Sequence, residues 1–194
     1  MKPAFPTILC FLLMFCAPAM AAADGSPWRT ELGYRFLNNA DELKDTCKHI
    51  AENSGENGDV YNFSISLNIQ PYRQFDNGFQ IGAGIGPLII VAGDAWHLLL
   101  PVNATLGQSF FVQSPVSPYI KTGISYHLSD GKNHSESTPG LYAGMGIRFF
   151  NKKPVKMGME IAYDSARTKL YDPIERKSHT ILTGELTLCV FADF

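Results

Sequence analysis

Two serines in the sequence lie close to side chains that could activate a hydroxyl group for acyl transfer. His127 and Ser129 are two residues apart. Because residues i and i+2 of a β-strand face the same side, the imidazole of His127 could reach the Ser129 hydroxyl as a base. Ser165 follows Tyr163 at the same spacing. A tyrosine with its ordinary pKa of about 10 is a poor base at neutral pH, so Ser165 should remain a weakly nucleophilic hydroxyl.

The elements that would position these residues begin after an expected signal peptide. Lys2 precedes a short apolar stretch, residues 8–15, and the small residues at 17–23 contain overlapping cleavage sites. We therefore expect residues 1–23 to be a cleaved signal peptide and residues 24–194 to be the mature domain. A buried N-terminal helix is the alternative interpretation. A lipoprotein signal is disfavoured, because the bulky Phe15 precedes Cys16.

The composition excludes several classes of protein. The formal net charge is −2 and charged residues make up 18% of the chain, so a nucleic-acid partner is not expected. The 17 glycines and the 12% share of aromatic residues are typical of a chain with many strands. No later stretch reaches the ~18 consecutive apolar residues of a transmembrane helix, and the best candidate, residues 79–93, is interrupted by Pro87.

From Trp28 onward, apolar and polar residues alternate with a period of two, which indicates strands with two different faces. Each run has roughly the length that a tilted strand needs to cross a bilayer, and an even number of strands is what a bacterial single-chain barrel requires. The eight predicted strands are residues 28–37, 60–72, 79–91, 96–111, 118–127, 140–150, 155–170 and 178–194. The predicted fold class is therefore all-β, an eight-stranded antiparallel transmembrane β-barrel.

The connections between these strands roughly alternate between long and short, as outer loops and periplasmic turns do in outer-membrane barrels. The expected outer loops are residues 38–59, 128–139 and 171–177, with a short one at 93–95. The short links are residues 76–78, 113–117 and 151–154. In the first loop, Leu43, Cys47 and Ile50 form one apolar stripe. Residues Asp41–Asn53 are therefore expected to form a short helix over the barrel rim, with a partly disordered loop as the alternative.

The two faces of each strand favour a membrane barrel over a soluble periplasmic β-protein. In the last strand, one face carries Leu182, Gly184, Leu186, Leu188, Val190, Ala192 and Phe194. The opposite faces of the strands carry mainly Ser, Thr, Asn and Gly with a few charges. A soluble β-protein would carry many lysines and glutamates on its wet face, whereas small polar residues suit the narrow lumen of eight strands.

When the alternation of the two faces is extended to every strand, the face opposite the apolar one carries a set of charged residues. This inward phase directs those residues into the lumen. Isolated charges there would be costly to desolvate, but near-balanced charges can pair. We expect a plug of ion pairs and hydrogen bonds rather than a pore, because a pore would need more strands. The predicted lumen network consists of Arg29, Glu31, Arg35, Lys121, Arg148, Lys156, Glu160, Asp164 and Glu185.

Three histidines, His97, His127 and His179, share this inward phase. Without cysteines or carboxylates at ligand spacing, the sequence favours hydrogen bonding in the lumen over a metal site, so no metal and no other cofactor are expected. Cys47 and Cys189 are the cysteines that remain after the signal peptide. The topology places them on opposite sides of the membrane, so no disulfide is expected between them.

Several Gly-rich and aromatic segments resemble the strands of a known group of membrane proteins. They are Pro118–Ile124, Gly140–Ile147, Met157–Tyr163 and the terminal Phe194. The chain resembles the outer-membrane protein β-barrel group, whose relatives in architecture are the OmpA- and OmpX-type proteins. The resemblance implies location in the cell outer membrane after signal cleavage, contact with outer-membrane lipids and lipopolysaccharide, and recognition of Phe194 by the barrel assembly machinery.

The segment Ile161–Ala166 also resembles a strand of the lipid A 3-O-deacylase family, another group of eight-stranded membrane barrels. That resemblance implies a nucleophile at Ser165 and a histidine base two residues before it, where this chain has Tyr163. His127 and Ser129 have the required spacing, but the phase directs His127 into the lumen and away from a lipid substrate.

The favoured interpretation is a non-enzymatic outer-membrane barrel with an envelope-structural role, or with a surface adhesion or binding role through its outer loops. The alternative is a lipid A 3-O-deacylase-like acyl hydrolase with Ser165 as its nucleophile.

Overall fold

The computed structural model describes residues 28–36, 40–56, 59–150 and 155–194. The expected signal peptide, residues 1–23, and the predicted link at 151–154 lie outside these residues. The elements are β1 (Trp28–Phe36), α2 (Ala40–Asn53), β2 (Tyr61–Ile65), β3 (Leu67–Gln74), β4 (Phe79–Ile85), β5 (Leu88–Ala92), β6 (His97–Ser109), β7 (Val116–Gly131), β8 (His134–Thr138), β9 (Gly140–Phe149), β10 (Lys156–Asp164), β11 (Arg167–Asp172), β12 (Lys177–Leu182) and β13 (Glu185–Asp193).

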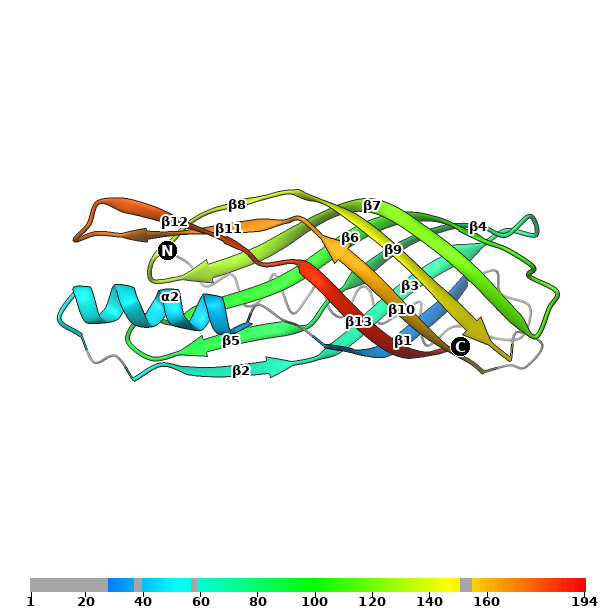
Figure 1. Ribbon diagram of the computed structural model, residues 1–194, viewed down its shortest axis with the longest axis horizontal. Coiled ribbons are helices and arrows are strands. Elements are labelled where there is room, and N and C mark those ends of the chain that lie inside the picture. Colours follow the sequence, from blue (N-terminus) through cyan, green and yellow to red (C-terminus); the bar gives the residue numbers. More distant parts are fainter. Residues whose placement is uncertain (1–27, 37–39, 57–58, 151–154) are drawn as a thin grey trace.

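The strands close into an antiparallel barrel (Figure 1). Its main sheet has the order β2-β5-β6-β4-β3-β1-β13-β10-β9-β7, and the ladder between β6 and β7 closes the ring. Ser66 alone separates β2 from β3, and Gly86 and Pro87 separate β4 from β5, so each pair is one interrupted strand of the barrel. The ring therefore has eight members, as the sequence predicts.

The barrel has two halves of different construction. The inner half contains β1, β3, β4, β9, β10 and β13, the outer half contains α2, β2, β5, β8, β11 and β12, and β6 and β7 run through both. In the outer half the ring divides. β7 stays beside β6 as far as Gly131, whereas β8 pairs with β11 in a separate three-stranded sheet of order β12-β11-β8.

Helix α2 closes one of the gaps that this division creates. Strand β1 ends at Phe36, although its neighbours in the ring continue into the outer half as β2 and β12. The helix contacts β2 and β5 on one side and β11 and β12 on the other, and Figure 1 shows it between those strands. The helix therefore takes the place that a longer β1 would have in the outer wall.

The inner half has an apolar outer wall and a polar interior. Along β10 the side chains alternate strictly between exposed and buried, with Met157, Met159, Ile161 and Tyr163 on the outside. The other large apolar side chains exposed on the inner half include Leu32, Tyr34, Leu67, Ile81, Leu106, Ile120, Ile124, Leu141, Met145, Ile147, Leu186, Leu188 and Val190. Such a band of exposed apolar surface is stable only where lipid, rather than water, surrounds it.

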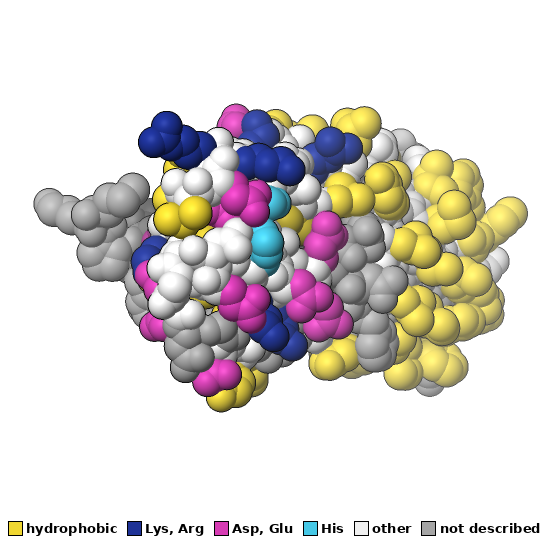
Figure 2. Space-filling model, turned by 60° about the vertical axis from the view of Figure 1, so that its left-hand side comes forward, with side chains coloured by type: hydrophobic (Ala, Val, Ile, Leu, Met, Phe, Trp, Pro, Cys, Tyr) yellow, Lys and Arg dark blue, Asp and Glu magenta, His cyan; other side chains and the backbone are white. Residues whose placement is uncertain are grey.

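The outer half has the opposite polarity. Its interior is an apolar core. The apolar stripe of α2, formed by Leu43, Cys47 and Ile50, packs there against inward side chains. Those side chains are Val60, Ile89, Val91, Leu99, Leu170 and Ile181. Its exterior is polar around β8, β11 and β12. Figure 2 shows charged side chains gathered at this end and apolar ones covering the more distant part. On the side of β8, β11 and β12 this end is built to face water, whereas β2 exposes the apolar side chains of Tyr61, Phe63 and Ile65.

The structure confirms the predicted helix, which begins one residue earlier than expected, at Ala40. The predicted outer loop at residues 128–139 is wrong, because β7 continues to Gly131 and β8 begins at His134. The predicted loop at 171–177 is likewise shortened to a turn, since β11 ends at Asp172 and β12 begins at Lys177. The polar strands of the outer half lack the apolar alternation that marks a strand in lipid, which explains both errors.

Pro87 and Pro101 lie together where β4 gives way to β5 beside β6. Pro101 pairs with His127 on β7, and on its other side β6 faces the break between β4 and β5 at Gly86 and Pro87. Pro101 accepts a hydrogen bond from the backbone N–H of Gly86 at 2.8 Å. The missing donors therefore fall where the ladder is already broken.

No helix among the described residues is long and apolar enough to cross a membrane. Cys47 and Cys189 are both buried free thiols. Cys47 belongs to the apolar core of the outer half, whereas Cys189 packs with Tyr119 and Phe191 in the inner half.

Candidate functional site

The lumen of the inner half contains a network of buried ion pairs that begins at Glu31. One carboxylate oxygen of Glu31 accepts a hydrogen bond from Lys121 Nζ at 2.8 Å, and the other accepts one from Arg148. The same Lys121 nitrogen lies 2.8 Å from Glu160 Oε2. All four side chains are 4% exposed or less. Each charge thus has an opposite charge within contact distance, which offsets part of the cost of its desolvation.

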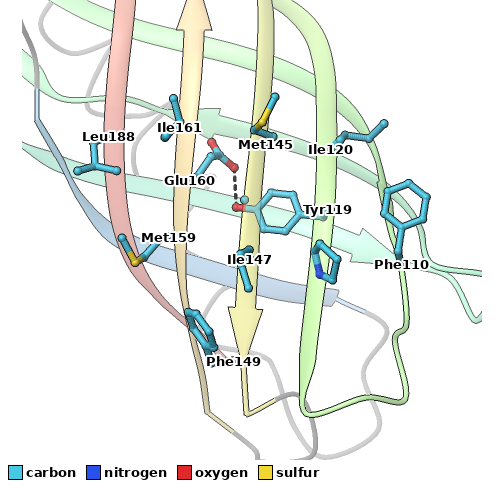
Figure 3. A pocket seen from close by; sticks show the side chains of 12 residues that line it. Phe110, Tyr119, Ile120, Met145, Ile147, Phe149, Met159, Glu160, Ile161 and Leu188 are labelled. Carbon is cyan, nitrogen blue, oxygen red and sulfur yellow. Dashed lines mark hydrogen bonds between the residues drawn. The ribbon is translucent and has the colours of Figure 1, made fainter.

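Tyrosines complete the hydrogen bonding of Glu160. Tyr119 donates to Oε2 at 2.8 Å, and Tyr142 donates to Oε1. Arg35 donates in turn to the Tyr142 hydroxyl at 3.2 Å. Figure 3 shows the Tyr119 ring crossing behind β9 to reach Glu160. It passes Gly146, where an added Cβ would lie 2.5 Å from the Tyr119 oxygen, so the contact requires a glycine.

Asp193 forms the third acidic centre of the network. Tyr72 donates a hydrogen bond to its Oδ2 at 2.7 Å, and Arg148 Nε lies 3.6 Å from the same oxygen. Arg148 also stacks over the Tyr119 ring, with its guanidinium carbon 4.0 Å from the ring centroid. Arg29 approaches Asp193 to 4.0 Å from the mouth of the barrel, where its side chain is 32% exposed.

The structure places most of the predicted lumen residues inside the barrel. Glu31, Arg35, Lys121, Arg148, Lys156, Glu160 and Asp164 are buried. The side chain of Glu185 lies outside the described part of the structure. Asp193, which the predicted network omits, is fully buried at its centre. Asp193 lies on the same inward face of the last strand as Cys189, so the alternation of that strand could have placed Asp193 in the predicted network.

A second polar cluster surrounds Asp164 at the boundary between the two halves. Its Oδ2 lies 3.0 Å from His127 Nε2, and its Oδ1 accepts hydrogen bonds from Ser125 and from the backbone N–H of Ala166. His127 Nδ1 lies 2.6 Å from the Thr183 hydroxyl. His127 is fully buried and faces the lumen, as its phase predicts. Both of its ring nitrogens are engaged, so it is not a base for Ser129.

Ser129 instead contacts a histidine on the neighbouring strand. Its Oγ lies 2.6 Å from His97 Nε2, a serine–histidine contact that the sequence spacing does not reveal. The ring next to His97 is the imidazole of His134, with ring centroids 5.8 Å apart, rather than a carboxylate. The pair has the nucleophile and the base of an acyl hydrolase, but not the acidic third group that orients the base in a triad.

Ser165 lies in the break between β10 and β11. Its hydroxyl accepts a hydrogen bond from the backbone N–H of Leu141 at 2.8 Å, and its own N–H donates to the Leu141 carbonyl. Tyr163 points outward on the wall and is exposed. The contacts of Ser165 are those of a residue that bridges two strands at a break, and none of them is to a base.

A third cluster lies on the outer half, where His49 of α2 meets Asp172 at the end of β11, Glu175 of the following turn, and His179 of β12. One ligand atom from each of the four lies within 4.8 Å of all the others. A hydrogen bond from Asn53, together with those from the backbone N–H groups of Glu175 and Ile174, lowers the pKa of Asp172 below its usual value. Sequence separation conceals this cluster, since its members come from segments more than a hundred residues apart.

Neither a known family model nor a curated protein matches the sequence. Solved structures of membrane barrels do resemble the fold. AlkL, solved by solid-state NMR in DMPC lipid bilayers, is 9% identical, with 86% of this chain and 88% of AlkL covered and a TM-score of 0.50. OprG from Pseudomonas aeruginosa is 12% identical, with 86% and 90% covered and a TM-score of 0.49. Neisserial surface protein A is 14% identical, with 87% and 95% covered and a TM-score of 0.49.

At these identities the likeness to AlkL concerns the fold alone. It agrees with the closed ring of eight strands and with the polarity of the inner half. The chain folds as a small outer-membrane β-barrel. The apolar band around the inner half of this outer-membrane barrel and its polar lumen together give its location, the outer membrane.

An apolar hollow lies in the wall of the outer-membrane barrel over β7, β9, β10 and β13 (Figure 3). Its volume is about 480 Å³. The outward side chains that line it are Phe110, Ile120, Met145, Ile147, Phe149, Met159, Ile161 and Leu188. Because the hollow opens within the apolar band, we expect acyl chains of the surrounding lipid to fill it.

Phe194 directly follows β13, the last strand of the outer-membrane barrel. Its backbone N–H and carbonyl both pair with Thr30 of β1 at 3.1 Å, and its side chain is exposed on the outer wall. Recognition of Phe194 by the barrel assembly machinery, which the resemblance implies, stays a prediction.

Proposed function

We propose that this outer-membrane barrel is non-enzymatic and serves the envelope as a sealed structural element that presents its outer half for adhesion or binding. The observation that carries the proposal is the filled interior. The ion pairs around Glu31 occupy the inner half, and the apolar core under α2 occupies the outer half. We expect the side chains that fill both halves of the described barrel to block a continuous aqueous path for solutes.

The surface that such a protein offers to a partner is the exterior of the outer half. The β8 strand, the turn between β11 and β12, and the polar face of α2 are exposed there, with pairs such as Lys169 with Glu136 and Lys48 with Glu52 at the surface. Lipopolysaccharide surrounds the outer part of an outer-membrane barrel, so we expect lipids and lipopolysaccharide to contact the exterior of this protein.

Conductance across a planar bilayer tests the sealed interior. The refolded protein should insert without producing stepwise currents, while its insertion is verified by the different migration of unboiled and boiled samples on detergent gels. Stable, reproducible channel openings by the unmodified protein would contradict the proposal.

Cells that lack the protein test the envelope role. Deletion should sensitise cells to detergents or reduce their adhesion to surfaces, and the unmodified gene should restore the phenotype. A variant in which residues 173–176 are replaced by a neutral turn should restore detergent resistance but not adhesion, if adhesion uses this surface. If deletion changes neither property, the envelope role is wrong.

A second candidate function, acyl hydrolysis, is favoured by the contact between Ser129 and His97. The distance of 2.6 Å from Oγ to Nε2 suits proton transfer from a nucleophilic serine. The candidate that the sequence suggests, Ser165, contacts backbone instead. Mass spectrometry of lipid A from cells with and without the protein separates the two functions. An unchanged acylation pattern supports the structural role, whereas loss of an acyl chain that Ser129→Ala or Ser165→Ala abolishes would establish the hydrolase and identify its nucleophile.

A further inference from the structure

The cluster of His49, Asp172, Glu175 and His179 on the outer half has the composition of a transition-metal site. Two imidazoles and two carboxylates supply the nitrogen and oxygen ligands that Zn²⁺ accepts, and the two negative charges balance a dication. The four residues come from α2 and from the hairpin of β11 and β12, and the closed outer half brings these two parts of the chain together.

The spacing of the ligand atoms is close to that of a tetrahedral site. Ligands at about 2.0–2.2 Å from Zn²⁺ lie roughly 3.4 Å from one another. His49 Nε2 lies 3.2 Å from Glu175 Oε1, and His179 Nε2 lies 3.9 Å from Glu175 Oε2. The most distant pair in the set is within 4.8 Å. The ligand atoms that lie farthest apart therefore need to approach each other by up to about 1.4 Å to surround one ion.

One ligand atom in the cluster has no hydrogen bond. His179 Nε2 is buried and has no partner at hydrogen-bonding distance, although it is directed toward Glu175. The His49 and His179 rings lie edge to face with centroids 5.8 Å apart, so both imidazoles approach the same point. A nitrogen that is buried without a partner is destabilising in a network held by hydrogen bonds alone, and coordination to a metal would satisfy it.

The surroundings hold the carboxylates in a binding orientation. Asp172 Oδ1 accepts the backbone N–H groups of Ile174 at 2.8 Å and Glu175 at 3.0 Å, which leaves Oδ2 directed into the cluster. The backbone contacts of Oδ1 orient this carboxylate before the metal arrives. Asn53 Nδ2 lies 2.9 Å from Asp172 Oδ2, 3.1 Å from Glu175 Oε1 and 3.1 Å from His49 Nε2, so without the ion the amide occupies the centre of the cluster and must move aside when the metal binds.

We propose that His49, Asp172, Glu175 and His179 bind one Zn²⁺ or a similar first-row transition-metal ion, which fastens α2 to the hairpin of β11 and β12. The site has four protein ligands and no open position, so its role is structural rather than catalytic. It closes the outer wall at the gap that β1 leaves, next to the apolar stripe of the helix.

Zinc titration of the refolded barrel in detergent micelles tests the proposal. A competing chromophoric chelator should report one Zn²⁺ per chain, and Co²⁺ should give the visible absorption of a tetrahedral complex. His49→Ala and His179→Ala should each weaken binding by at least the roughly 10–100-fold that loss of an outer-shell partner causes. Glu175→Gln keeps the shape of the side chain and should also weaken binding, which provides a test should a histidine variant fail to fold.

Two control variants show whether zinc binds at this cluster or elsewhere on the chain. His134→Ala removes a histidine of the outer half that is outside the cluster and should leave zinc binding unchanged. Asn53→Ala removes hydrogen bonds within the cluster but no ligand, so zinc should still bind with one ion per chain. The proposal is overturned if the chain binds neither Zn²⁺ nor Co²⁺, or if His134→Ala weakens binding as much as His49→Ala and His179→Ala do.

Discussion

Arg148 is the residue on which most of the lumen network depends. It pairs with Glu31 and Asp193, and it lies over the rings of Tyr72 and Tyr119. A guanidinium group suits this position, because its planar fork can contact two acids while its face stacks on aromatic rings. The other cations of the lumen could not replace it without leaving an acid unpaired.

Replacement of Arg148 by alanine should therefore destabilise the barrel by about 3–5 kcal/mol, since it leaves two buried acids without this partner. Urea unfolding of the protein in lipid vesicles, followed by tryptophan fluorescence, measures the change. Lys48→Ala removes a cation from an exposed pair on α2 and should have little effect. Equal stability of Arg148→Ala and the unmodified protein would mean that the network does not hold the lumen together.

The strand phase predicts which charges point inward but not which of them meet. Glu31 and Lys121 are 90 residues apart in sequence, and Glu31 and Arg148 are 117 apart. Partners across a lumen depend on the register and tilt of eight strands, and the alternation of residues carries no information about either. The same limit hid the contact of Ser129 with His97 and the cluster at His49.

At the scale of elements, α2 could be predicted because its signal is local. Its apolar residues recur at helical spacing within fourteen residues, and the stripe of Leu43, Cys47 and Ile50 is buried. Strand β8 could not, since His134–Thr138 is polar throughout and pairs with a strand about thirty residues away. A polar strand outside the membrane is indistinguishable from a loop by periodicity alone.

The packing of α2 controls the reactivity of Cys47. Burial raises the pKa of the Cys47 thiol to about 12, so at pH 8 almost none of it is the reactive thiolate. Iodoacetamide should label Cys47 slowly in the folded barrel and rapidly in Ile50→Ala, because a cavity at the centre of the stripe loosens the helix. Asp45→Ala, on the exposed face, is the control. Rapid labelling of the unmodified protein would contradict the docked helix.

Denaturation provides the related test of the cysteine pair. Without reductant, unfolded protein should react at both Cys47 and Cys189, since the structure has them as free thiols in separate cores. Mass spectrometry counts the labels. An intramolecular disulfide would require a different arrangement of the strands.

At the scale of the whole molecule, the polarity of the barrel reverses along its axis. The inner half is apolar outside and polar inside, and the outer half is the reverse around β8, β11 and β12. The alternation of residues, extended along every strand, predicts a polar lumen throughout. The inward Ile89, Val91, Leu99, Leu170 and Ile181 depart from that prediction, because they form the apolar core of a projecting structure.

Arginine substitutions on the two outer surfaces should differ in cost. Leu188→Arg places a charge near the middle of β13, in the apolar band, and should destabilise the barrel by ~2–4 kcal/mol near the bilayer midplane. Tyr171→Arg places the same charge on exposed β11 and should change stability little. Unfolding in vesicles compares the two variants, and similar costs would mean that the membrane does not end between these positions.

Spin labels along one continuous face test the central claim, that the inner half lies in the membrane and the outer half projects from it. Single cysteines replace outward residues Met157, Met159, Ile161, Arg167, Lys169 and Tyr171 of β10 and β11, in a background without Cys47 and Cys189. In vesicles, labels on β10 should relax with dissolved oxygen, and labels on β11 should relax with a water-soluble nickel complex. The change from access by oxygen to access by the nickel complex should occur at the break around Ser165. Uniform access of the nickel complex along both strands would contradict this arrangement.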